Sequence, residues 1–221
     1  MRKGKMKPVV RREWLQLVVF DLDGVLVDVD SSWQAVHRAF KVDNEENYRK
    51  YLEGKIDYKE FTRLDVNLWG KVSAVQIKRV LDRLPLMEGA SETVFALKDA
   101  GYRTAIISSG ISLLVDRVRR QLDICRSFSN RLVIDSGGCL SGECEEAVAL
   151  LGKVRFLKEL AYLEGITPKE CAAVGDSVYD IPLFKVAGFG IAFNAREYKV
   201  RDAADVVVEG KDLMAILPYL T

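Results

Sequence analysis

Acidic residues directly follow two separate apolar runs in this 221-residue chain. Asp21 and Asp23 come after the run LVVF at residues 17–20, and Asp176 follows the short run CAAVG. The β-branched and aromatic residues of the first run are typical of a buried strand, and Gly24 permits a tight turn after it. A helix cap accounts for one acid after a strand, but it gives no reason for a second acid two residues later. We therefore interpret these acids as parts of a chemical site.

A hydroxyl and a lysine occur at comparable places. The strand predicted at residues 102–107 ends in a turn with Ser109 and Gly110, where a serine is also a good helix cap. Lys153 lies near the start of a helix predicted over residues 150–163, at the end of the helix dipole that disfavours a cation. Ligands of open α/β sheets bind at the carboxyl ends of the strands. We expect these groups to meet the three acids at one edge of the sheet.

Carboxylates gathered in this way need a cation, and their hard oxygen ligands favour Mg²⁺ completed by water and a substrate phosphate. Ser109 and Lys153, with backbone N–H groups near Leu22 and Gly110, would hold an anion beside the metal. The pattern predicts a site built from carboxylates, magnesium and phosphate.

The nucleophile predicted for this site is a carboxylate. His37 is the single histidine and is remote in sequence from all four cysteines, so a Cys–His pair, a Ser–His pair and a zinc site are disfavoured. A carboxylate can form an aspartyl phosphate that water later hydrolyses. We predict that Asp21 attacks the phosphorus and that Asp23 carries protons.

Strand and helix patterns alternate from residue 86 to the end of the chain, interrupted by a hairpin predicted at residues 131–145. This alternation predicts an α/β, Rossmann-like fold with a mainly parallel sheet covered by helices on both faces. No strand is predicted between Asp30 and Pro85, where helices are expected at about 33–40, 44–53, 57–69 and 73–84.

A helical stretch of this length exceeds an ordinary strand-to-helix connection. We therefore expect a core of residues 1–30 and 86–221 and a small helical cap domain of residues 31–85, inserted after the first strand. The aromatic residues of this insertion are expected mostly in its own core, with one or two facing a cleft.

The bulk properties are those of an ordinary globular enzyme. The apolar share is 49%, the charged share is 29% and the net charge is +1, so no field of one sign points to nucleic acid or a membrane. The basic segment 2–12 is followed by no apolar signal region and is expected to be a solvated tail. We expect a cytoplasmic protein with reduced cysteines, and the sequence leaves both monomer and homodimer open.

The motifs together resemble the haloacid dehalogenase (HAD) superfamily. DLDGV at 21–25, Ser109, Lys153 and GDSVYD at 175–180 are similar to its four motifs, in their usual order. The segment 152–220 is most similar to the phosphoserine phosphatase branch, and the resemblance covers nearly the whole core.

The resemblance implies a role for each matching residue. Asp21 would be the nucleophile and a magnesium ligand, and Asp23 the general acid and base that offers the metal its backbone carbonyl. Ser109 and Lys153 would bind the transferring phosphoryl group. Asp176 would complete the protein ligands of Mg²⁺, and Asp180 would orient Lys153 or a metal-bound water. The implied substrate is a small phosphorylated metabolite.

The cap departs from the phosphoserine phosphatase pattern. Asp30 stands where that branch has a glutamate for the serine ammonium group. A gap-free reading from EGK at 53–55 places Asp65 where the branch has an arginine for the serine carboxylate, with Arg63 two residues away. A carboxylate facing Asp65 would be repelled, so the sequence does not predict phosphoserine specificity.

Two other functions stay open on the sequence. DLDGVLVD also resembles the opening motif of β-phosphoglucomutase-type phosphotransferases, and a binding protein could keep the fold and bind phosphate without turnover. The full set of acids, serine and lysine and the C-terminal half favour a magnesium-dependent phosphomonoesterase.

Overall fold

A seven-stranded sheet forms the centre of the molecule, within the parts of the chain that the computed structural model describes, residues 12–145 and 148–220. The strand order is β4-β3-β2-β1-β5-β6-β7, and only the β3–β4 pair is antiparallel. The strands are β1 (Leu17–Phe20), β2 (Arg103–Ile111), β3 (Arg126–Ile134), β4 (Leu140–Glu145), β5 (Cys171–Gly175), β6 (Phe189–Phe193) and β7 (Val206–Val208). The predicted, mainly parallel α/β sheet is confirmed.

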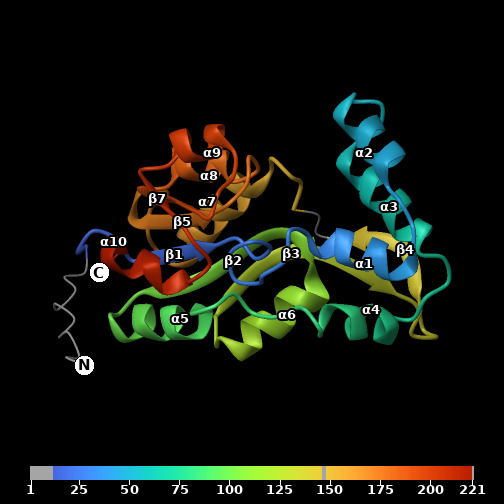
Figure 1. Cartoon of the computed structure of the whole chain (residues 1–221), viewed down its shortest axis with the longest axis horizontal. Coiled ribbons are helices and arrows are strands. Elements are labelled where there is room, and N and C mark those ends of the chain that lie inside the picture. Colours follow the sequence, from blue (N-terminus) through green and yellow to red (C-terminus); the bar gives the residue numbers. More distant parts are fainter. Residues whose placement is uncertain (1–11, 146–147, 221) are drawn as a thin grey trace.

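Helices cover both faces of this sheet (Figure 1). One face carries α5 (Ala90–Asp99) and α6 (Ser112–Gln121), and the other carries α7 (Lys153–Leu163), α8 (Ile181–Val186) and α9 (Tyr198–Ala203). The chain closes with a 3₁₀ turn (Leu213–Ile216) and α10 (Leu217–Leu220), and another 3₁₀ turn (Pro168–Glu170) precedes β5.

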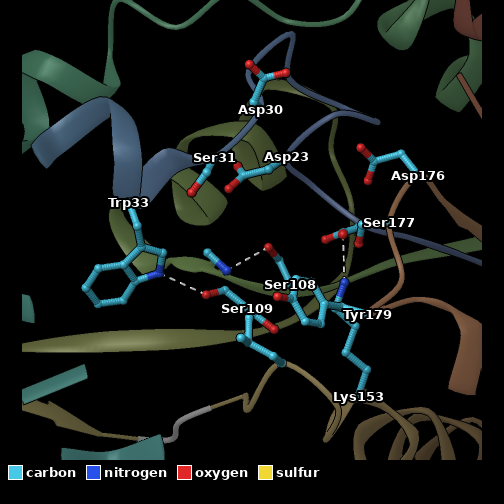
Figure 2. Close-up of a pocket in the computed structure, with 13 residues that line it drawn as sticks. Asp23, Asp30, Ser31, Trp33, Ser108, Ser109, Lys153, Asp176, Ser177 and Tyr179 are labelled. Carbon is cyan, nitrogen blue, oxygen red and sulfur yellow. Dashed lines mark hydrogen bonds and ion pairs between the residues drawn. The ribbon is translucent and has the colours of Figure 1, made fainter. Parts of the chain in front are cut away.

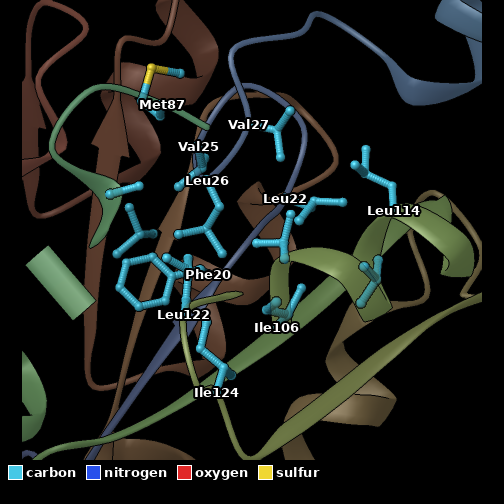
Figure 3. Packing of buried hydrophobic residues seen from close by; sticks show 14 of the residues in the cluster. Phe20, Leu22, Val25, Leu26, Val27, Met87, Ile106, Leu114, Leu122 and Ile124 are labelled. Atoms are coloured by element: carbon cyan, nitrogen blue, oxygen red, sulfur yellow. The ribbon is translucent and has the colours of Figure 1, made fainter. Parts of the chain in front are cut away.

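The alternation of side chains along β1 divides the apolar core in two. Val18 and Phe20 belong to the cluster under α5 and α6, whereas Leu17 and Val19 belong to the cluster under α7, α8 and α9. All four side chains are buried, and Figure 3 shows Phe20 within the cluster under α5 and α6. A strand buried on both faces is held rigidly, so the residues that leave its carboxyl end are well positioned.

Four helices lie between β1 and α5, and Figure 1 shows them beside the β3–β4 hairpin. They are α1 (Ser32–Phe40), α2 (Glu45–Leu52), α3 (Tyr58–Leu68) and α4 (Ala74–Leu81). Ser31, Asp57 and Ser73 cap α1, α3 and α4, each accepting a hydrogen bond from a backbone N–H three residues on. The helices expected in this stretch are therefore present, with boundaries within about three residues of those expected.

Two boundaries differ in a way that affects the site. β2 continues to Ile111 instead of ending at residue 107, and its pairing with β3 shifts register between Ile107 and Ile111. The predicted turn residues Ser109 and Gly110 therefore belong to an extended strand end. The helix expected from residue 150 begins at Lys153.

The expected solvated tail at residues 2–12 lies outside the described residues except for Arg12. The guanidinium of Arg12 lies over the Phe189 ring, 4.1 Å from its centroid, and donates to the Tyr219 carbonyl, so this residue packs against the core. None of the helices in the described residues is both long and apolar enough to cross a membrane.

Candidate active site

The carboxyl ends of β1, β2 and β5 enclose a cavity of about 150 Å³, called here the acidic pocket (Figure 2). These strands are neighbours in the sheet, so residues that are distant in sequence meet at one edge. The polar residues that line it are Asp21, Asp23, Asp30, Ser31, Ser108, Ser109, Lys153, Asp176, Ser177 and Tyr179.

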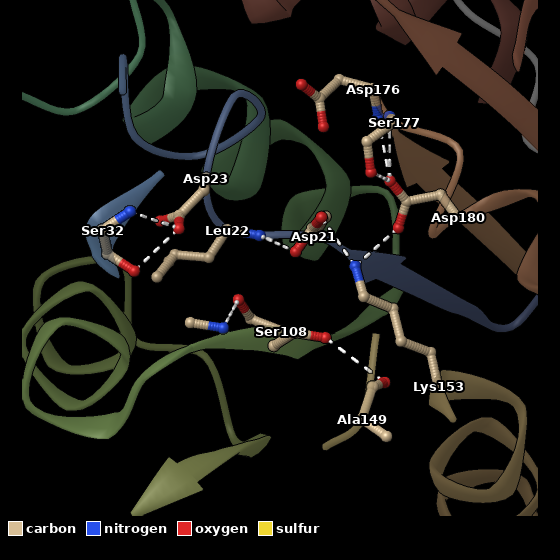
Figure 4. Close-up of polar contacts among 12 residues, drawn as sticks. Asp21, Leu22, Asp23, Ser32, Ser108, Ala149, Lys153, Asp176, Ser177 and Asp180 are labelled. Carbon is tan, nitrogen blue, oxygen red and sulfur yellow. Dashed lines mark hydrogen bonds and ion pairs between the residues drawn. The ribbon is translucent and has the colours of Figure 1, made fainter. Parts of the chain in front are cut away.

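A buried lysine joins two acids at the floor of this pocket. Lys153 is 1% exposed, and its Nζ lies 2.7 Å from Asp21 Oδ2 and 2.7 Å from Asp180 Oδ1 (Figure 4). The other oxygen of Asp180 accepts hydrogen bonds from the backbone N–H groups of Asp176 and Ser177 and from the Ser177 hydroxyl. Asp180 therefore fixes the positions of Lys153 and of the loop that carries Asp176. Through its contact with Lys153, it also fixes the position of Asp21.

Burial and mutual repulsion shift the ionisation of the acids. Desolvation, with the neighbouring Asp180, raises the pKa of Asp21 to about 7 although Lys153 opposes the shift. Desolvation and the charges of Asp21 and Asp180 raise the pKa of Asp176 to about 8. Burial alone would lower the pKa of Lys153, but Asp180 and Asp21 outweigh it, so this pKa is raised and the side chain is a permanent cation.

Asp23 is held by one of its carboxylate oxygens only. Its Oδ2 accepts hydrogen bonds of 2.7 Å from both the backbone N–H and the hydroxyl of Ser32. Its Oδ1 is buried and has no hydrogen-bond partner, and desolvation raises the pKa of Asp23. An anchored carboxyl group with one oxygen available and a raised pKa is suited to accepting and donating a proton.

The acids also form a group that fits a metal ion. Asp21, Asp176 and Asp180 each offer an oxygen, and these oxygens lie within 4.8 Å of one another. Both oxygens of Asp180 and both oxygens of Asp21 already have protein donors, whereas the described residues supply none to Asp176. A cation here would therefore bind Asp176 and share Asp21 with its donors. Burial, together with repulsion among the acids, raises the pKa of Asp21 and of Asp176, and a cation would favour their ionised forms.

Gly24 makes room for this group. Its φ is +78°, and a Cβ added there would lie 2.2 Å from Asp176 Oδ2. Any other residue would therefore both strain the turn after Asp23 and displace the Asp176 carboxylate. The glycine of the DLDG sequence is required by the position of an acid from a different strand.

Sequence reasoning missed Ser108, which lies in the acidic pocket beside Ser109. The Ser109 hydroxyl donates to the Ala149 carbonyl at 3.4 Å, whereas the Ser108 hydroxyl accepts from the Gly110 N–H at 2.9 Å. A Cβ on Gly110 would lie 3.0 Å from Ser108 Oγ and 3.3 Å from Asp23 Oδ2, so these two oxygens face the same space. The Ser108 hydroxyl can therefore still donate a hydrogen bond to an anion bound beside Asp23.

The alternation of side chains in an extended strand is the signal that separates these two serines. The expected turn at Ser109 obscured it, because β2 was predicted to end at residue 107. Ser32 and Ser177, which hold Asp23 and Asp180, carried no signal in the sequence.

Of the two cap residues expected to bind substrate, Asp30 lies at the acidic pocket and Arg63 does not. Asp30 lines the acidic pocket, although its side chain is 80% exposed and lies 3.5 Å from Arg196. Arg63 lines neither this pocket nor its neighbour, because it forms a two-pronged pair with Glu60 on α3. Arg63 is therefore not brought to the site.

A second cavity of about 260 Å³, called here the aromatic pocket, adjoins the first. The two share the lining residues Ser31, Trp33, Ser109, Leu150 and Tyr179. Helices α1 to α3 contribute four aromatic side chains, more than the one or two expected to face a cleft: Trp33, Tyr48, Tyr58 and Phe61.

Hydrogen bonds bridge the helices α1 to α3 and the core beside these pockets, among them one from Asn130 Nδ2 to the Tyr58 hydroxyl at 2.8 Å. Trp33 Nε1 and Asn130 Nδ2 both donate to the Ser109 carbonyl, at 3.0 and 2.6 Å. The hydroxyl of Tyr48 on α2 lies 2.6 Å from that of Tyr179, in the loop after β5. These contacts bring the two pockets together over the ends of the strands.

The model of the haloacid dehalogenase-like hydrolases matches residues 15–188. This chain belongs to that family. The family match spans the acid-bearing strands, Lys153 and the GDSVYD segment, which are the elements that build the acidic pocket.

Individual relatives agree with the family match. The chain is 32% identical to a phosphoserine phosphatase of Methanocaldococcus jannaschii, over 93% of this chain and 97% of that protein. It is 34% identical to one from Albidiferax ferrireducens, over 95% and 91%. A solved structure of a phospho-aspartyl intermediate analogue of phosphoserine phosphatase superposes with a TM-score of 0.80 at 31% identity, covering 94% of this chain and 99% of that one.

The raised pKa values predict how the stability of the metal-free protein depends on pH. Folding raises the pKa of Asp21 to about 7 and of Asp176 to about 8, so the folded state binds protons more tightly than the unfolded chain. This contribution is complete below the ordinary aspartate pKa and is lost as the pH rises through these two values. We expect the melting temperature in EDTA to fall by about 5 °C or more between about pH 5 and about pH 9.

Thermal melts followed by circular dichroism measure this effect. The slope should be smaller in Asp176→Asn and smaller in wild type with Mg²⁺, because either change removes repulsion among the acids. A melting temperature that rises over this pH range in EDTA would contradict the assigned pKa shifts.

Proposed function

We propose that this protein is a magnesium-dependent phosphomonoesterase that hydrolyses a small phosphorylated metabolite through an aspartyl phosphate on Asp21. The observation that carries the proposal is the placing of Asp21 between a buried lysine and a second, anchored acid in one pocket. The match to the hydrolase family and the names of the relatives support it.

The first step forms a bond between Asp21 Oδ and phosphorus while the bond from phosphorus to the ester oxygen breaks. Lys153 and the Ser108 hydroxyl would hold phosphoryl oxygens, and Asp23 would give its proton to the departing alcohol. Bound Mg²⁺, held by Asp21, Asp176 and the backbone carbonyl of Asp23, would neutralise charge that otherwise keeps a carboxylate from approaching a phosphate.

The second step releases inorganic phosphate. Asp23, now ionised, takes a proton from a water molecule as that water attacks the phosphorus of the aspartyl phosphate. The bond from phosphorus to Asp21 breaks, and the carboxylate is regenerated. The helical segment 31–85 would act as the cap, since its bridges from Trp33 to Ser109 and from Tyr48 to Tyr179 cover the pocket and limit entry of water.

Phosphate release from p-nitrophenyl phosphate tests this function. We expect turnover with Mg²⁺ and none in EDTA, with activity returning when Mg²⁺ is restored. Binding of inorganic phosphate without turnover of any phosphomonoester would indicate a binding protein instead. Conversion of β-glucose 1-phosphate to the 6-phosphate would indicate a phosphotransferase.

The two serines of β2 should differ in their effect on this activity. Ser108→Ala removes a hydroxyl whose proton is available to an anion, and we expect kcat/KM to fall by about 10–100-fold. Ser109→Ala removes a hydroxyl that is bonded to Ala149, so we expect a loss of about threefold or less. Inhibition by inorganic phosphate should weaken in the same order. An equal or larger loss in Ser109→Ala would overturn this assignment.

A further inference from the structure

The aromatic pocket is the space beside the reacting phosphate into which the alcohol of the substrate would extend. It shares five lining residues with the acidic pocket, so the two cavities adjoin directly. In Figure 2, Trp33 and Asp176 lie at opposite sides of the acidic pocket, and Trp33 is the side that continues into the aromatic pocket. The chemistry of this second pocket therefore selects the alcohol, an inference that rests on the proposed phosphatase function.

Asp65 supplies a buried acid to the aromatic pocket. It is 2% exposed, and its oxygens accept hydrogen bonds from Asn44 Nδ2 at 2.6 Å and Asn47 Nδ2 at 3.0 Å. A third contact, 3.2 Å long, joins Asp65 Oδ2 to His37 Nε2. Whether His37 is charged decides whether Asp65 already has a cationic partner.

The contact of His37 with Trp69 shows which ring nitrogen of His37 carries the proton. Its indole Nε1 lies 2.9 Å from His37 Nδ1, and an indole N–H can only donate a hydrogen bond. His37 Nδ1 must therefore be an unprotonated acceptor, which places the one ring proton on Nε2, facing Asp65. All three partners of Asp65 are then neutral donors, and the part of the chain that the structure describes supplies no cation to this carboxylate.

The rest of the lining also favours a cation. The aromatic rings of Trp33, Tyr48, Tyr58, Phe61 and Tyr179 line the pocket, and the faces of such rings attract a positive charge. Among the described residues that line the two pockets, Lys153 is the sole cation, and it is already bound to Asp21 and Asp180. No other positively charged side chain in this lining could pair with a carboxylate.

We propose that the preferred substrates are phosphate esters of alcohols that carry an ammonium group and no carboxylate. The ammonium group would lie among the rings and face Asp65, while the phosphate occupies the acidic pocket. A carboxylate on the same alcohol would face Asp65 and be repelled. The selectivity therefore comes from the buried Asp65 carboxylate. This charge lacks a cationic partner because the contact with Trp69 keeps His37 neutral.

Three small phosphate esters test the ammonium group and the carboxylate separately. O-phosphoserine differs from O-phosphoethanolamine by its carboxylate, and 2-hydroxyethyl phosphate differs from O-phosphoethanolamine by having a hydroxyl in place of the ammonium group. With wild-type protein and Mg²⁺, we expect kcat/KM for O-phosphoethanolamine to exceed each of the other two by about tenfold or more, mainly through KM.

Variants test whether the aromatic pocket causes this preference. Asp65→Asn should bring the ratio of O-phosphoethanolamine to 2-hydroxyethyl phosphate close to one. Phe61→Leu keeps the site apolar but removes a ring face, and should lower the ratio by about threefold. Glu60→Gln removes an acid from the exposed face of the same helix and should leave the ratio unchanged. Because the readout is a ratio, a general loss of folding does not imitate it.

The outcomes separate the two proposals. Failure to hydrolyse any of the three esters or p-nitrophenyl phosphate would overturn the phosphatase function itself. Turnover of p-nitrophenyl phosphate together with a preference for O-phosphoserine, or with no preference for O-phosphoethanolamine over 2-hydroxyethyl phosphate, would overturn the ammonium selectivity alone. An unchanged ratio in both Asp65→Asn and Phe61→Leu would also overturn it.

Discussion

We expect Asp21→Asn to lower the rate of phosphate release from p-nitrophenyl phosphate by at least about a thousandfold, because an amide cannot form the proposed aspartyl phosphate. Asp21 is the acid whose oxygen contacts Lys153 in the acidic pocket, and Leu22 N–H donates to its other oxygen at 2.7 Å. The amide keeps the size of the side chain, so the loss reports chemistry. The measurement is steady-state release of p-nitrophenol with Mg²⁺.

The control is Asp28→Asn, in the same stretch of sequence. Asp28 is exposed and pairs with Lys211 at 2.8 Å, away from the acidic pocket, so we expect activity within about twofold of wild type. Activity of Asp21→Asn within tenfold of wild type would exclude Asp21 as the nucleophile.

Asp23→Asn distinguishes the nucleophile from the proton carrier. With p-nitrophenyl phosphate, whose p-nitrophenolate leaves without a proton, this variant can still form the aspartyl phosphate on Asp21, but it lacks the base that activates water. Intact-protein mass spectrometry after acid quenching should detect one added phosphoryl group with Asp23→Asn and none with Asp21→Asn. Phosphorylation of Asp21→Asn would place the nucleophile elsewhere.

We expect Lys153→Met to destabilise the metal-free protein by roughly 3 kcal/mol or more and to lower kcat/KM by about a hundredfold. The lysine is fully buried, and its removal leaves Asp21 and Asp180 close together without a cation. The methionine keeps the apolar stem of the side chain, so the change isolates the charge. Urea denaturation in EDTA and initial-rate kinetics with Mg²⁺ measure the two effects.

A control at an exposed lysine and a double variant test whether the effect is due to the charge of Lys153. Lys158→Met changes an exposed lysine on the same helix α7 and should alter stability by less than about 0.5 kcal/mol. Adding Asp180→Asn to Lys153→Met should recover part of the lost stability, since one unpaired buried charge is removed, but no activity. Wild-type stability of Lys153→Met would show that the lysine does not hold the acids.

The local patterns of the sequence were sufficient to predict the sheet and the polar residues at its edge. The apolar run before Asp21, the run before Asp176 and the strand before Ser109 predicted three strand ends, and a parallel sheet brings such ends together. These features depend on residues adjacent in the chain, so they can be read without tertiary contacts. The family match spans the same elements.

Relations between residues that are distant in sequence depended on the tertiary structure. The register shift after Ile107 extends β2, and this extension, not the residue type, gives Ser108 and Ser109 opposite directions. Arg63 and Asp65 are two residues apart on α3 and face different surroundings. One pairs with Glu60 away from the pockets, and the other is buried in the aromatic pocket.

The sequence by itself thus determined the fold class, the acids and the lysine, because strand and helix periodicity and the motif residues are local properties. Tertiary structure alone decided which serine proton is available, why Gly24 must lack a side chain, and that Asp65 keeps an uncompensated charge. Each of these depends on an atom supplied from another part of the chain: Ala149 for Ser109, Asp176 for Gly24, and the indole of Trp69 for the proton of His37. Contacts of this kind exist only after folding has brought the segments together.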